Sequence, residues 1–113
     1  MIKLDDFKPL SRTDIARLSE ANAISDAAFI AGDFDDAKGM ILVVRYGTIE
    51  PKKGVLFKQD NKPRVFTTPE TIMNNAQKLG INEYRIDATN WEANYYKVYK
   101  AQAKRNKERK QQQ

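Results

Sequence analysis

The sequence of 113 residues contains neither cysteine nor histidine. Without cysteine, disulfide bonds, zinc–thiolate sites and thiol chemistry are excluded. Without histidine, the commonest general base and the commonest transition-metal ligand are also missing. The only serines are Ser11, Ser19 and Ser25, and no histidine is present to activate one of them as a nucleophile.

Motifs for nucleotide and metal binding are lacking as well. Neither a Walker A sequence nor a glycine-rich dinucleotide fingerprint occurs. Counting from Asp33, the sixth position is Lys38 and the twelfth is Val44, where a calcium-binding loop needs glycine and glutamate. We therefore expect no enzymatic activity, no catalytic residue, no metal site and no small-molecule cofactor.

Long hydrophobic runs are absent too. The longest, from Met40 to Val44, is far shorter than the roughly 20 apolar residues that span a bilayer. The start, MIKLDDFKPL, is short and acidic and has no apolar segment like that of a secretory leader. We expect an intracellular, cytoplasmic protein with no membrane partner.

Charge is unevenly distributed along the chain. Its 20 basic and 15 acidic residues give a net charge of +5. Residues 1–39 have a balance of −3, residues 40–90 of +3, and residues 91–113 of +5. Such asymmetry indicates a polyanionic partner, although a basic surface also aids solubility.

The first part of the chain is predicted to be helical. Ser11 and Asp14 fit the acidic variant of a capping box, so residues 12–31 are expected to form a helix interrupted near Asn22. Residues 32–39 then form an acidic turn between two glycines. A winged helix-turn-helix is the alternative, but its recognition helix, residues 25–31, would carry Asp26 and no cation, which phosphates disfavour.

The middle of the chain predicts a sheet. Residues 40–46 are apolar on both faces and belong at the centre of the sheet. Strands at 55–59 and 63–67 are expected next, each joined to the strand before it by a hairpin turn. A fourth strand is expected at 82–87. A right-handed crossover through a helix at 69–79 then gives the order 4-1-2-3.

The helix at 69–79 has strong terminal signals. Thr67 and Glu70 fit a capping box with Thr68 as the alternative cap, Pro69 suits the first turn, and Gly80 suits the position after the last. Its predicted buried stripe includes Met73. The fold class is thus α+β, a four-stranded mixed sheet with helices on one face.

A final helix is predicted from Thr89. Trp91, Tyr95 and Val98 form its apolar stripe, which ends near residue 100, and a continuously basic face follows. We expect one domain over residues 1–103, with residues 1–10 loosely ordered, and a flexible basic tail over residues 104–113.

Two groups of cations and tyrosines are the candidate nucleic-acid contacts. The sheet group comprises Arg45, Lys52, Lys53, Lys58, Lys62 and Arg64. The C-terminal group comprises Tyr96, Lys97, Tyr99, Lys100, Lys104, Arg105, Lys107, Arg109 and Lys110. Cations neutralise phosphates, and tyrosines beside them stack on exposed bases.

The expected function is nucleic-acid binding by an accessory or regulatory protein. DNA is favoured over RNA, because the segment 62–80 resembles, at the level of fold only, three-strand-plus-helix DNA-binding modules such as the arm-binding domains of integrases. Two alternatives stay open: a protein–protein adaptor or assembly component whose basic tail binds an acidic partner, and a solvated tail with no ligand. A homodimer on duplex DNA is also compatible with the sequence, although no heptad or extended apolar face requires it.

Overall fold

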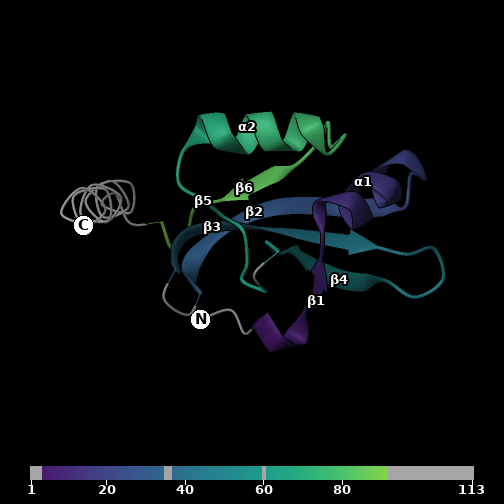
Figure 1. Ribbon diagram of the computed structural model, residues 1–113, viewed down its shortest axis with the longest axis horizontal. Helices are drawn as coiled ribbons and strands as arrows, with labels where there is room; N and C mark the ends of the chain where they lie inside the picture. Colours follow the sequence, from purple (N-terminus) through teal and green to yellow (C-terminus); the bar gives the residue numbers. More distant parts are fainter. Residues whose placement is uncertain (1–3, 35–36, 60, 92–113) are drawn as a thin grey trace, which may run out of the picture.

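Six strands and two α-helices make up the part of the chain that the computed structural model describes, residues 4–34, 37–59 and 61–91. The elements, with one short 3-10 helix, are η1 (Leu4–Asp6), β1 (Lys8–Leu10), α1 (Arg12–Glu20), β2 (Ile24–Phe34), β3 (Ala37–Tyr46), β4 (Lys52–Leu56), β5 (Val65–Phe66), α2 (Pro69–Lys78) and β6 (Arg85–Asp87). Both α-helices lie on the same face of one mixed sheet (Figure 1). The predicted α+β class is confirmed.

The sheet has the order β1-β4-β3-β2-β6, and β5 pairs with the first part of β3. β3 lies at its centre, with Leu42 and Val44 in the helix-side core and Ile41 and Val43 in the cluster on the opposite face. The central position predicted from its two apolar faces is confirmed. The predicted order of four strands is wrong, because β2 lies between β3 and β6 and because β1 adds a parallel edge beside β4.

The largest correction concerns residues 24–34, which form a strand and not a helix. Helix α1 ends in a Schellman motif, in which Asn22 takes the left-handed position with φ 54°. The Asn22 N–H donates to Ser19 O at 3.1 Å, and the Ala23 N–H donates to Leu18 O at 2.9 Å. The chain then leaves the helix, and β2 pairs antiparallel with β3 over its whole length. The glycines expected in a turn, Gly32 and Gly39, are opposite each other in this ladder.

β4 and β5 share one edge of β3. Their bounds, 52–56 and 65–66, differ from the predicted 55–59 and 63–67 because the chain leaves that edge between them. We call residues 57–59 and 61–64 the β4–β5 loop. A bridge between Phe57 and Pro63 closes it, and the Arg64 N–H donates to Leu56 O at 2.9 Å.

The main core fills the space between the sheet and the helices. Ile15 of α1 and Ile72, Ala76 and Leu79 around α2 pack on buried residues of β2, β3 and β4. A smaller cluster around Ile41, Val43 and Val55 lies on the opposite face, where the η1 segment packs against it. Residues 4–10, expected to be loosely ordered, comprise η1, which lies by this cluster, and β1, which is the edge strand beside β4 (Figure 1).

Helix α2 follows its terminal signals. Thr68, the alternative cap, is the N-cap, and its Oγ1 accepts from the Thr71 N–H at 3.3 Å. The helix ends at Lys78 with Leu79 as its C-cap, and Gly80, with φ 76°, follows in a second Schellman motif. Met73, predicted to be buried, is 62% exposed. The strand predicted at 82–87 is confined to β6, where Ile86 is 50% exposed at the edge of the sheet.

One ion pair joins β2 to β6. The Arg85 guanidinium donates to Asp26 through Nη2 at 2.8 Å and through Nε at 3.3 Å. These hydrogen bonds from Arg85 hold the pKa of the Asp26 carboxyl below its ordinary value of 3.8. The stabilisation is therefore present above that ordinary pKa and is lost as the pH falls through the lowered one.

We predict that Asp26→Asn reduces the loss of stability on acidification. Urea unfolding at pH 7 and at steps down to pH 2 measures it, because the variant has no proton to bind at this site. Glu83→Gln is the matched control, since Glu83 is exposed and makes no ion pair with any residue that the structure describes. Equal acid sensitivity in the wild type and Asp26→Asn would contradict the role of this pair.

The predicted final helix lies mostly in residues 92–113, outside the described part. Its predicted first residues, Thr89 and Asn90, form a turn, in which the Trp91 N–H donates to Ala88 O at 3.0 Å. Trp91, at its predicted start, packs against the helix-side core.

Candidate functional site

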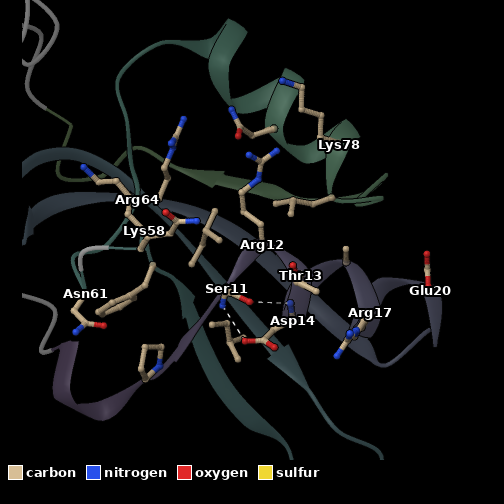
Figure 2. A pocket seen from close by; sticks show the side chains of 18 residues that line it. Ser11, Arg12, Thr13, Asp14, Arg17, Glu20, Lys58, Asn61, Arg64 and Lys78 are labelled. Atoms are coloured by element: carbon tan, nitrogen blue, oxygen red, sulfur yellow. Dashed lines mark hydrogen bonds between the residues drawn. The ribbon is translucent and has the colours of Figure 1, made fainter.

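An open groove of about 1240 Å³ lies between α1, α2 and the β4–β5 loop. In Figure 2, the labelled side chains that line the groove come from these three elements. Buried Leu10, Leu56 and Leu79 contribute to its lining, and the remaining lining is mostly polar. Its cations are Arg12, Arg17, Lys58, Arg64 and Lys78, and its carboxylates are Asp14 and Glu20. The groove thus has an excess of positive charge.

A capping box at the start of α1 positions the residues on the α1 side of the groove. The Ser11 N–H donates to Asp14 Oδ2 at 3.0 Å, and the Asp14 N–H donates to Ser11 Oγ at 3.1 Å. This capping box, predicted from the sequence, is confirmed, and it holds Arg12 in the first position of the helix. The backbone and side-chain hydrogen bonds with Ser11 lower the pKa of Asp14, so its carboxylate stays ionised and engaged with the helix start.

On the α2 side of the groove, the C-terminal end of α2 is joined to α1 by a hydrogen bond. Ser19 Oγ of α1 donates to Gly80 O at 2.7 Å, which joins the C-terminal ends of the two helices. Lys78 lies in the last turn of α2 and is exposed. The two helices therefore present Arg12 and Lys78 from opposite sides of the groove (Figure 2).

The groove cations lack carboxylate partners. Within the described residues, Arg12, Lys58 and Lys78 make no ion pair and no hydrogen bond from their side chains. Arg64 has its guanidinium carbon 5.9 Å from the centroid of the Phe66 ring, and it too has no carboxylate partner in this part of the chain. The groove also contains the carboxylates of Asp14 and Glu20, but its five cations outnumber them. This excess of positive charge favours an anionic ligand, because the mutual repulsion of the cations falls when one binds.

The structure divides the predicted sheet cations between two places. Lys58 and Arg64 line the groove, and Lys62 lies in the same β4–β5 loop. Arg45, Lys52 and Lys53 lie instead on the β3–β4 hairpin, all exposed. The six residues therefore do not form one continuous rim on the described part of the molecule.

Sequence reasoning missed Arg12, Arg17 and Lys78 as site residues. The net charge of −3 for residues 1–39 conceals the two arginines of α1, and the terminal signals and buried stripe of the helix at 69–79 do not indicate a role for Lys78. The available signal was the confirmed capping box, because it places Arg12 at the exposed start of a helix.

The predicted C-terminal contacts, from Tyr96 to Lys110, lie outside the described residues. Within residues 4–34, 37–59 and 61–91, no cluster of acidic side chains suits a metal ion, and no helix has the length and hydrophobicity to cross a membrane. The chain matches no protein-family model, no curated protein and no solved structure.

Proposed function

We propose that this protein binds nucleic acid, with duplex DNA as the favoured form, by taking phosphates of the backbone into the groove between α1, α2 and the β4–β5 loop. The observation that carries the proposal is the convergence of Arg12, Lys58 and Lys78 without carboxylate partners among the described residues. Neutralising phosphates with such cations releases condensed counterions, which is the main source of sequence-independent affinity.

The arrangement suits a repeating anion better than a compact one. The cations come from three elements and surround an open groove, whereas a small-molecule site encloses most of its ligand with convergent groups. Successive phosphates are spaced along a strand and can each meet a different element. Asn61 and Asn75, which also line the groove, supply amides for additional polar contacts with the backbone or with base edges.

The test is the salt dependence of binding to labelled duplex DNA, single-stranded DNA and RNA, measured by fluorescence anisotropy. The wild type is expected to bind duplex DNA with a log–log slope of about −0.9 per phosphate contact. The triple variant Arg12→Ala, Lys58→Ala, Lys78→Ala should lower the magnitude of that slope by about 2–3, because each cation meets one phosphate.

The control is Lys8→Ala, which removes an exposed cation that does not line the groove. It should leave the slope nearly unchanged. Deleting residues 104–113 separately measures the contribution of the basic tail, which carries five of the chain's cations. It should weaken binding uniformly across sequences.

Two outcomes would contradict the proposal. One is the absence of binding to any nucleic acid below about 100 μM at low salt, which is weaker than most non-specific binders. The other is preferential binding of a polyglutamate peptide over every nucleic acid, which would support the alternative of an adaptor with an acidic protein partner.

A further inference from the structure

The β3–β4 hairpin carries the most exposed of the large apolar side chains in the described part of the chain. Ile49 is 93% exposed, compared with 62% for Met73 and 50% for Ile86. The last pair of the hairpin stem is Tyr46 with Lys52, so Ile49 is the middle residue of the connecting loop 47–51. This loop extends away from the sheet at the end where α1 lies (Figure 1).

Several contacts fix the base of this hairpin. The Gly47 N–H donates to Ala23 O at 3.1 Å, and Ser25 Oγ donates to Arg45 O at 3.3 Å. Gly47 has φ 101°, and a Cβ there would lie 2.8 Å from Glu50 O, so this position needs glycine. Pro51 further restricts the backbone on the other side of the tip. The exposed isoleucine is therefore presented by an anchored loop.

Cations flank this apolar tip on both faces of the hairpin. Arg45 and Lys53 are cross-strand partners and lie on one face, whereas Lys52 pairs with Tyr46 and lies on the other. Glu50 is the only acidic residue between Arg45 and Lys53. An aliphatic tip backed by cations on two sides is complementary to a narrow apolar gap between two anionic walls.

The magnitudes favour a base-pair step over a lipid surface. Burying one isoleucine side chain removes only a small apolar area from water. That is little for membrane anchoring, where even a whole myristoyl chain gives only marginal binding. Minor-groove proteins, in contrast, use single Ile, Leu or Pro wedges between base pairs while cations contact the adjacent phosphates.

We propose that the β3–β4 hairpin enters the minor groove of duplex DNA and inserts Ile49 between two base pairs, which kinks the duplex. Arg45, Lys52 and Lys53 contact the phosphates on the two sides of the groove. This inference rests on the proposed function, because it assumes that the protein binds duplex DNA. It adds to that function a bend in the bound duplex. It also predicts that the protein prefers flexible pyrimidine–purine steps, because these base-pair steps unstack at the lowest cost.

The test is energy transfer between dyes at the two ends of a short duplex with one central TA step. Wild-type protein should raise the transfer efficiency, as expected for a kink of about 20–90°. Ile49→Ala should abolish the rise while changing affinity by less than about tenfold, because the cost of unstacking disappears together with the wedge. A side chain this exposed makes few contacts, so the variant should fold normally.

Ile86→Ala and Met73→Ala are the matched controls, since each removes an exposed apolar side chain elsewhere. Both should retain the rise in transfer. Unchanged transfer on binding of the wild type, or an equal rise with Ile49→Ala, would overturn the wedge and leave the groove proposal intact. Ile49-dependent binding to vesicles of anionic phospholipid, without bending of DNA, would also overturn it. Absence of any binding to nucleic acid would instead remove the proposed function itself.

Discussion

Replacing Phe29 by alanine is expected to lower the free energy of unfolding by about 3–5 kcal/mol. Phe29 lies in β2 and is fully buried. Its ring makes edge-to-face contacts with Phe66 and Tyr84, each with centroids 5.2 Å apart. The substitution removes the transfer free energy of the ring, leaves a cavity and breaks both aromatic pairs. Since a domain of this size is stable by only about 5–15 kcal/mol, a large part of its stability would be lost.

Urea unfolding followed by circular dichroism measures this change. The matched control is Ile86→Ala, because Ile86 is the cross-strand partner of Phe29 on β6 but is half exposed. Its cost should be well below that of Phe29→Ala, since less area leaves water on folding. Similar costs for the two variants would show that β2 does not supply the centre of the core.

Gly54→Val is expected to destabilise the protein by about 3 kcal/mol, at the upper end for overpacking of a core. Gly54 lies in β4 opposite β1. An ideal Cβ there would lie 2.8 Å from Leu10 Cγ, closer still to Leu10 Cδ1, and 3.2 Å from Tyr46 Cε1. Leu10 and Tyr46 are both buried, so neither can move into solvent without uncovering apolar surface.

A double-mutant cycle with Leu10→Ala tests this explanation. Removing the Leu10 side chain should itself cost about 2–5 kcal/mol, but it also vacates the place that a valine at position 54 needs. The double variant should therefore be more stable than the sum of the single costs predicts, by about 1 kcal/mol or more. Additive costs would contradict the steric argument. Leu10 directly precedes the capping box of α1, so Gly54→Val should also weaken the proposed nucleic-acid binding through a displaced Arg12.

Much of the fold follows from local signals. The Ser11–Asp14 capping box, Pro69 at the start of α2 and Gly80 at its end each fix a boundary by short-range hydrogen bonds and backbone preference. The two apolar faces of residues 40–46 place β3 at the centre of the sheet for a similar reason.

The missed elements depend on partners distant in the sequence. Residues 24–34 are rich in alanine, which suits a helix, and become a strand because Asn22 ends α1 and β3 provides a long partner. β1 needs the free space over Gly54, which no local pattern shows. For the same reason the sequence predicts only two of the cations that line the groove, Lys58 and Arg64, from their places at strand ends and hairpins of the sheet. Arg12 and Lys78 join them only through the packing of both helices on one face.

The shared edge of β3 has a consequence for how the groove can change. Because β4 and β5 are both hydrogen-bonded to the same strand, each end of the loop carrying Lys58 and Arg64 is fixed independently of the loop's length. Insertions between them leave the sheet register in place, and each doubling of loop length costs only about 0.6 kcal/mol in closure entropy. The length and charge of this loop can thus vary while the sheet and both helices keep their arrangement.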